Sequence, residues 1–261
     1  MMRTLRLLRA FWTNSIQVEL EFRADLVVNL INAPLMFGAG LVVLAAVFAD
    51  AQTIGGWTFE EAIAVLGVFL IVDGFVGTVL SPNLGQLPHY IRLGNLDYML
   101  LMPVGSHFHV SLRHLNLWEL PNLLLGTGLV FWSMLTLGRF DLTIAATFLV
   151  MLAAGLTIAF ALWSVIYTAS FWFVRVSNLE VMFRSVIDIG RFPLTALPSW
   201  LRMVLTAVIP VAFVTNVPAS AVAGRLDWRM ALISFAVAAI AFAISRLFWR
   251  RAIASYTSAS S

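Results

Sequence analysis

Apolar runs alternate with short polar segments along this chain, and most of the runs have the length of a membrane-spanning helix. Such a helix takes about 20 mostly apolar residues, because lipid offers the backbone no hydrogen-bond partner outside the helix itself. Five runs meet this requirement, at residues 26–48, 62–80, 115–137, 142–174 and 230–249. The run 142–174 is longer than one crossing needs, so we expect it to tilt or to extend past the interface.

The segment between the fourth and the last of these runs has a mixed pattern, and its four prolines exclude one uninterrupted helix. We expect a fifth crossing at 178–197, followed on the outer side by a re-entrant or interfacial pair of short helices at 199–218. The alternative puts the crossing at 194–218 and makes 178–191 an interfacial helix. Both versions give one crossing. The sequence therefore predicts an all-α polytopic membrane protein with six transmembrane helices in a single domain, 1–261.

Composition agrees with this prediction and excludes several kinds of chemistry. Of the 261 residues, 61% are hydrophobic and 11% charged, whereas soluble proteins have about 45–50% and about 25%. The chain has no Cys, which excludes disulfides, thiol nucleophiles and cysteine metal sites. All 16 basic residues are Arg, so a phosphate-binding loop with its Lys and Schiff-base chemistry are excluded as well.

The Arg residues separate the apolar runs and predict how the chain is oriented. With six crossings, eleven of them fall on one side and three on the other, and such an excess marks the cytoplasmic side. We therefore expect a multi-pass protein of the bacterial inner membrane with both termini in the cytoplasm, and no cleavable signal peptide. No basic cluster on a soluble face suggests nucleic acid as a partner.

Residues 1–25 precede the first crossing and have an amphipathic pattern. Leu5, Leu8, Trp12 and Ile16 recur at three- or four-residue spacing, with basic residues off that stripe. This pattern predicts an interfacial helix that lies on the bilayer. A basic flanking segment that only sets topology is the alternative.

The cytoplasmic segment 81–114 is the least ordinary part of the chain. It holds all four His residues and a short helical pattern with apolar residues at Leu93, Leu96 and Leu100, which Pro103 ends. A short amphipathic helix in a loop lies on the membrane surface or docks in a groove of a soluble partner.

Polar residues inside the expected crossings are candidates for function, because charge in the hydrocarbon is costly. Asp188 has Arg184 and Arg191 on its helical face, and we favour a structural ion-pair triad over a substrate-facing role. The complete set of intramembrane polar candidates is Asn29, Asn32, Asp73, Arg184, Asp188 and Arg191. The His residues lack Cys or a close carboxylate set, so we expect no metal site.

Two stretches of the sequence resemble the ATP-binding cassette (ABC) type-2 permeases, in particular the six-span subfamily that pairs two unlike permeases. The first stretch reads Ile91-Arg92-x-Gly94-x-Leu96-Asp97-x-x-Leu100-Leu101-x-Pro103-Val104 and is similar to the cytoplasmic loop motif of that family. The second holds Pro198-x-Trp200-Leu201-Arg202, Ile209-Pro210-Val211-Ala212-Phe213 and Val217-Pro218-Ala219, and resembles the family's segment between the fifth and sixth spans.

The resemblance implies a transmembrane exporter subunit without an ATPase site of its own. It implies that ATP and Mg are bound by a separate cytoplasmic ABC ATPase, and that a second six-span permease, homologous or identical, completes the pathway; this chain binds no cofactor. The implied ATPase-coupling residues are Ile91, Arg92, Gly94, Leu96, Asp97, Leu100 and Pro103. The implied outer-gate residues are Pro198, Trp200, Pro210, Phe213 and Pro218. An ATP-independent secondary transporter or a membrane-embedded enzyme is the alternative.

Overall fold

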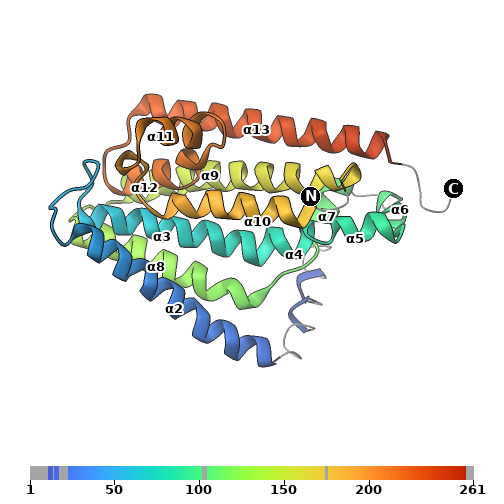
Figure 1. The fold of residues 1–261 in the computed structure, drawn as a ribbon, viewed down its shortest axis with the longest axis horizontal. Helices are drawn as coiled ribbons and strands as arrows, with labels where there is room; N and C mark the ends of the chain where they lie inside the picture. Colours follow the sequence, from blue (N-terminus) through green and yellow to red (C-terminus); the bar gives the residue numbers. More distant parts are fainter. Residues whose placement is uncertain (1–10, 14, 18–22, 102–104, 174–175, 257–261) are drawn as a thin grey trace.

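The computed structural model describes residues 11–13, 15–17, 23–101, 105–173 and 176–256. Within these ranges the chain is a bundle of helices with no β-strand (Figure 1). Its six longer helices are α2 (Arg23–Phe48), α3 (Phe59–Phe75), α8 (Leu120–Thr136), α9 (Leu142–Thr168), α10 (Val176–Ile187) and α13 (Trp228–Ala254). The prediction of an all-α polytopic membrane protein is therefore confirmed.

Shorter helices gather at the two ends of the bundle. A π-helical turn, Val76–Leu80, and α4 (Ser81–Leu84) continue α3, and the loop that follows holds α5 (Leu87–Arg92), α6 (Asn95–Leu100) and α7 (Ser106–Ser111). We call this end, which also carries the end of α13, the loop end (Figure 1). At the far end lie the turns 49–58, 137–141 and 223–227, together with α11 (Ser199–Ala207) and α12 (Val217–Val222).

Three helices of the described part are long and apolar enough to cross a membrane: Phe59–Arg92, Leu142–Phe171 and Trp228–Ala254. The pair formed by α11 and Ala212–Val222, bent by 80°, would make a fourth if it counted as one span. In the described part of α2 the stretch Phe37–Phe48 forms a shorter apolar helix, and α8 and α10 are shorter than a full crossing. The total of six crossings thus stays a prediction.

The helix boundaries depart from the expected ones where prolines and polar residues intervene. The third apolar run begins at 115, but α8 starts at Leu120, with Pro121 in its first turn, where a missing N–H costs nothing. In the fifth expected span, α10 and a 3-10 turn end at Arg191, two residues before Pro193, instead of continuing to 197. In the expected interfacial segment 1–25, residues 11–13 and 15–17 are helical, and most of the remainder lies outside the described residues.

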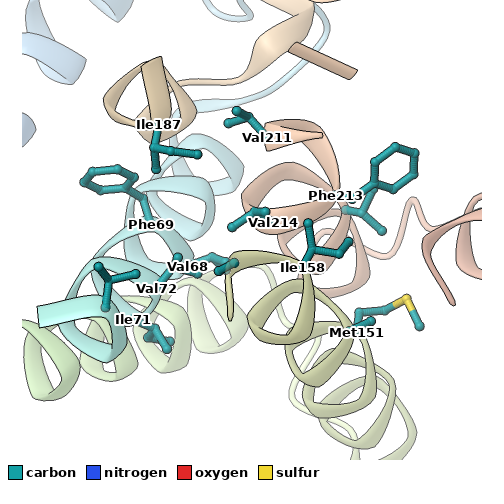
Figure 2. Packing of buried hydrophobic residues seen from close by; sticks show 14 of the residues in the cluster. Val68, Phe69, Ile71, Val72, Met151, Ile158, Ile187, Val211, Phe213 and Val214 are labelled. Atoms are coloured by element: carbon teal, nitrogen blue, oxygen red, sulfur yellow. The ribbon is translucent and has the colours of Figure 1, made fainter. Parts of the chain in front are cut away.

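Helix α3 forms the centre of the core. Buried side chains of α3, Val68 and Val72, lie near Ile158 of α9 and Val214 of the segment before α12 (Figure 2). In the helical stretch Phe59–Arg92, which begins with α3, 83% of the most apolar part is buried, whereas in α13 the corresponding value is 17%. The bundle is therefore built around α3, with α13 at its surface.

Candidate functional site

The loop of residues 85–101 turns sharply at Gly94, between α5 and α6. Gly94 has a φ of +71°, a left-handed conformation that residues with a Cβ rarely adopt. It lets the chain reverse within one residue after α5 and start α6 at Asn95. Gly94 thereby sets the direction of α6.

Burial within α6 determines which side chains of the loop remain free. Leu96 and Met99 are buried in the core, whereas Leu93, Tyr98 and Leu101 are 58%, 67% and 85% exposed. The expected single apolar face through 93, 96 and 100 is therefore wrong: Leu96 anchors the loop, and Leu93 precedes the helix and lies outside it. Pro103, which we expected to end the helix, lies outside the described residues.

The other implied coupling residues differ in exposure. Arg92 is exposed, Ile91 and Leu100 are half-buried, and Asp97 is half-buried near Tyr256 at the end of the chain. Burial and the carboxylate of Asp97 raise the pKa of Tyr256 above its ordinary value. The end of α13 and the loop are thus close neighbours.

Asn83 of α4 ties the two ends of the loop together. Its amide nitrogen donates to the carbonyls of Val79 and His114, at 2.6 and 2.7 Å, and its carbonyl oxygen accepts from the His114 backbone N–H at 2.7 Å. The Ser15 hydroxyl both donates to the Leu115 carbonyl, at 3.0 Å, and accepts from its N–H, at 2.9 Å. The base of the loop is thus fixed by side chains from distant parts of the sequence.

The segment that holds the expected outer-gate residues turns back within the bundle. On its way in, the backbone nitrogen of Ala196 lies 2.6 Å from the point that a Cβ on Gly55 would occupy. Its middle reaches α9 halfway along, where the Val214 carbonyl oxygen lies 2.9 Å from the Cβ position of Gly155. On its way out, Arg225 again contacts the start of α3. The segment therefore enters and leaves at the far end.

The five expected outer-gate residues are divided between core and surface. Phe213 and Pro218 are buried, and Pro210 is half-buried. Pro198 and Trp200 are exposed at the far end. Asn216, which the sequence did not single out, holds the segment in place, because its side-chain oxygen accepts from the Leu194 backbone N–H at 2.9 Å.

An ion pair joins the exit of this segment to α3. An Arg225 guanidinium nitrogen lies 2.7 Å from Oε2 of Glu61, which is buried, and Arg225 also donates to the Gly56 carbonyl. The same Glu61 oxygen accepts from the backbone N–H of Thr58 at 3.0 Å and completes the capping box of α3. One carboxylate thus both caps α3 and holds the chain before α13.

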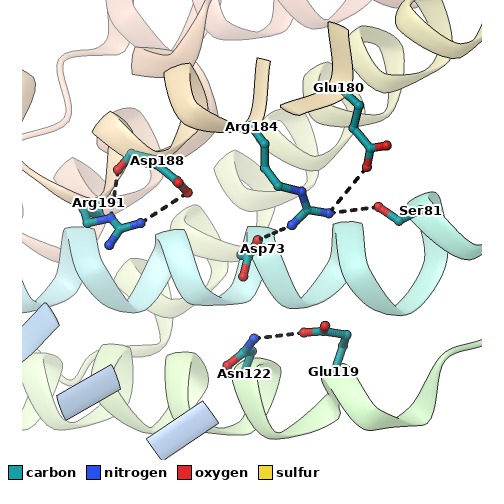
Figure 3. Close-up of polar contacts among 8 residues, drawn as sticks. All are labelled: Asp73, Ser81, Glu119, Asn122, Glu180, Arg184, Asp188 and Arg191. Carbon is teal, nitrogen blue, oxygen red and sulfur yellow. Dashed lines mark hydrogen bonds and ion pairs between the residues drawn. The ribbon is translucent and has the colours of Figure 1, made fainter. Parts of the chain in front are cut away.

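The charged residues of α10 and of the 3-10 turn that follows it, Asp188–Arg191, form two separate groups instead of a triad (Figure 3). Arg184 reaches α3, with 3.3 Å to Oδ1 of Asp73 and 3.0 Å to the Ser81 hydroxyl, and lies 3.9 Å from Glu180. Arg191 pairs with Asp188 at 3.2 Å, and its guanidinium lies over the ring of Phe69 at 5.1 Å. The expected triad is therefore wrong in its membership: Asp188 pairs with Arg191, while Arg184 pairs with Asp73 and Glu180. Whether these pairs are structural or face a substrate stays a prediction.

Polar residues on α8 lie on the other side of α3 from α10. Glu119 accepts from Asn122 at 3.0 Å (Figure 3). A Cβ on Gly77 would lie 2.6 Å from the Glu119 side chain, so this glycine makes room for the carboxylate. The side chains of Asn29 and Asn32 are not among those that the structure describes. Within the described ranges, no three His, Asp or Glu side chains gather in a way that would hold a metal ion.

Comparison with known families bears on these features. The family model described as "ABC-2 family transporter protein" matches residues 34–260, which is most of the chain. The chain belongs to this family. No match was found among curated proteins or among solved structures. It is thus a transmembrane permease subunit of the ABC-2 type. Members of this family are membrane subunits of transporters and are not enzymes themselves.

Several residues of this ABC-2 permease that organise its candidate sites were missed from sequence. Four of them take part in the polar contacts beside α3: Ser81, Glu180, Glu119 and Asn122. In the sequence each is an ordinary polar residue near the end of an apolar run, so nothing marks it as part of a site. The partner of Arg184 lies 111 positions away, so helical spacing alone gives no sign of it.

Proposed function

We propose that this permease is the transmembrane subunit of an ABC exporter in the bacterial inner membrane, with both termini in the cytoplasm. It works with a separate cytoplasmic ABC ATPase, which binds ATP and Mg, and with a second six-span permease, identical or homologous, that completes the pathway. The observation that carries the proposal is the exposed apolar surface of the loop, formed by Leu93, Tyr98 and Leu101.

This surface, which we call the docking face, is suited to a soluble partner. Leu96 and Met99 are buried in the permease itself, and this fixes α6 so that the docking face points away from the core. The loop lies at the loop end, where α5 and α6 reach about as far as the end of α13 (Figure 1). Large apolar side chains grouped on an exposed surface mark an interaction site. A groove on the ATPase would bury them.

The charged pairs of α10 support a role in the pathway between two permease chains. The side chains of Asp73, Glu180, Arg184, Asp188 and Arg191 are 26–46% exposed. Ionised groups that face hydrocarbon cost several kcal/mol, so a surface of this kind faces water or protein. The apolar surface of α13, in contrast, is suited to lipid. We therefore assign the α10 side of this chain to the pathway.

Association with the ATPase tests the proposal most directly. Leu101→Asp and Tyr98→Asp should abolish copurification of the ATPase, because a carboxylate on the docking face cannot enter an apolar groove without a large desolvation cost. Leu142→Asp is the matched control: Leu142 is 83% exposed and lies at the far end. Copurification that survives both loop substitutions, or no ATPase bound to the native permease, would refute the coupling role and leave the membrane surface as the site of this loop.

The assignment of the pathway has its own test, and the Cys-free chain makes it clean. A membrane-impermeant thiol reagent reacts only with a thiol that reaches water, since the thiolate is the reactive form. We expect Ser185→Cys on α10 and Asp188→Cys in the 3-10 turn that follows to react at least about tenfold faster than Leu232→Cys and Ile240→Cys on the exposed face of α13. Equal rates on the two helices would contradict the assignment.

A further inference from the structure

The last turns of α13 are joined to the loop at α7. The ring of Trp249 stacks on His107, with the ring centres 4.8 Å apart and the planes inclined by 18°. The indole N–H of Trp249 donates to the Ser106 hydroxyl at 3.3 Å. Both rings are buried, so this contact is dry and has a fixed geometry.

His107 also connects this contact to α9. Its Nε2 lies 2.7 Å from the Ser164 hydroxyl, and its ring lies 5.5 Å from that of Phe160. Burial lowers the pKa of His107 to about 4, with a further contribution from the charge of Arg246, so the ring is neutral at physiological pH. The junction of α7, α9 and α13 is therefore held by stacking and hydrogen bonds, without a salt bridge at His107.

Of the three long apolar helices in the described ranges, α13 is the least enclosed: 17% of its most apolar stretch is buried, against 44% for Leu142–Phe171 and 83% for Phe59–Arg92. Its buried side chains are mostly small, among them Ser234, Ala238 and Ser245, and they face α9. Small residues let α13 lie close to α9, and Trp249 is the one large side chain among the buried residues of α13.

The far end of α13 continues directly into the segment that turns back within the bundle. Only the turn at Gly224–Asp227 separates α13 from α12, and Arg225 in that turn is paired with Glu61. The connection from α13 to the turned-back segment that holds Phe213 and Pro218 is therefore short, and the Arg225–Glu61 pair holds it against α3.

We propose that Trp249, through Ser106 and His107, is a positioning residue that links the loop to α13, so that displacement of the loop at one end moves the turned-back segment at the other. This rests on the proposed function, because it takes the ATPase to be the source of the displacement. The transmitting element is then α13.

The test uses the complete permease with its copurified ATPase in lipid nanodiscs. Val208→Cys, at an exposed position where α11 ends, reports on the turned-back segment through its rate of reaction with an impermeant maleimide. We expect the rate to differ at least about threefold between the nucleotide-free complex and the complex trapped with ATP and vanadate. Trp249→Leu should abolish this difference, and Trp249→Phe, which keeps an aromatic ring on His107, should retain most of it.

Two further variants keep the test decisive. Ser106→Ala removes only the hydrogen bond and should lower the difference without disturbing the packing. Trp132→Leu, at an exposed Trp of α8, is the control and should leave the difference unchanged. A full difference in both Trp249→Leu and Ser106→Ala, or equal loss in Trp132→Leu, would overturn the role of Trp249. Absence of a bound ATPase would instead refute the proposed function. With the ATPase bound, no difference in the otherwise native chain would refute this inference alone.

Discussion

Gly67 of α3 and Gly126 of α8 face each other with no side chain between the two helices. A Cβ on Gly67 would lie 2.9 Å from the carbonyl oxygen of Gly126, and a Cβ on Gly126 would lie 2.6 Å from that of Gly67. Gly74, two turns further along α3, meets Leu123 of α8 at 2.8 Å in the same way. Close contact through small residues is a usual means of joining helices in a membrane, where the hydrophobic effect contributes little.

Gly126→Val should therefore destabilise the permease. The added side chain must push α3 and α8 apart, and overpacking of this kind costs about 1–3 kcal/mol. Gly128→Val is the matched control on the same helix, because a Cβ at Gly128 meets nothing within 4 Å. Thermal unfolding in detergent, followed by Trp fluorescence, should give a lower midpoint for Gly126→Val than for the control. Equal midpoints would show that the close contact is not needed.

The apolar runs could be predicted from sequence because a helix in lipid must satisfy its own backbone. The start of α3 could be predicted too: Thr58 and Glu61 form the capping box that their spacing indicates. The register of the loop could not be predicted, because the apolar pattern places residues 93, 96 and 100 on one continuous helix. Gly94 adopts a left-handed conformation and starts a new helix at Asn95, which puts Leu93 out of register.

The partners of the charged residues lay beyond prediction for a different reason. Helical spacing finds neighbours on the same stretch of chain, and it correctly joins Asp188 with Arg191 in the 3-10 turn after α10. It cannot find Asp73, because which face of α3 meets α10 depends on how the whole bundle packs. The π-helical turn Val76–Leu80 likewise has no sequence signal of its own.

Removal of the Arg225 side chain should loosen the far end of the molecule. Arg225→Ala leaves the buried carboxylate of Glu61 without its guanidinium partner, although the Thr58 N–H still bonds to it. Loss of one member of a buried ion pair costs about 3–5 kcal/mol, and we expect about 1–2 kcal/mol here because Arg225 is partly exposed. Limited proteolysis should then cut the turn 49–58 faster than in the native chain.

The Arg225→Ala, Glu61→Gln double variant provides the control. It removes both charges, so it should recover part of the stability that Arg225→Ala loses. Arg229→Ala, at an exposed position four residues further along, should leave the rate of proteolysis unchanged. If the double variant loses as much stability as Arg225→Ala and Glu61→Gln lose together, the two residues do not interact.

A side chain at Gly94 should weaken association with the ATPase more than it weakens the fold. The left-handed conformation costs a residue with a Cβ about 1–2 kcal/mol, so Gly94→Val favours another turn and another direction for α6. Gly94→Asn, which tolerates this conformation better, should retain most of the association. Copurification of the ATPase is the measurement, with Gly105→Val, at an open position with negative φ, as the control. Equal losses in all three variants would contradict a specific role for the turn.

The buried His107 should make the stability of the permease fall in mild acid. Its pKa is lowered from 6.5 to about 4 in the folded protein, so the unfolded chain takes up the proton first as the pH falls. The stabilisation is complete above pH 6.5, decreases as the pH falls toward 4, and changes no further below that. Between pH 7.5 and pH 5 this single group accounts for about 2 kcal/mol of lost stability.

His107→Gln isolates this contribution, because the Gln amide keeps a hydrogen bond to Ser164 and does not titrate in this range. His109 and His114, whose pKa values are also lowered by burial, are present in both proteins and cancel in the comparison. Unfolding midpoints measured in detergent at pH 7.5 and pH 5 should fall less for His107→Gln than for the native chain. The same decrease in both would mean that the pKa of His107 is not lowered in the folded protein, because its ring already reaches water.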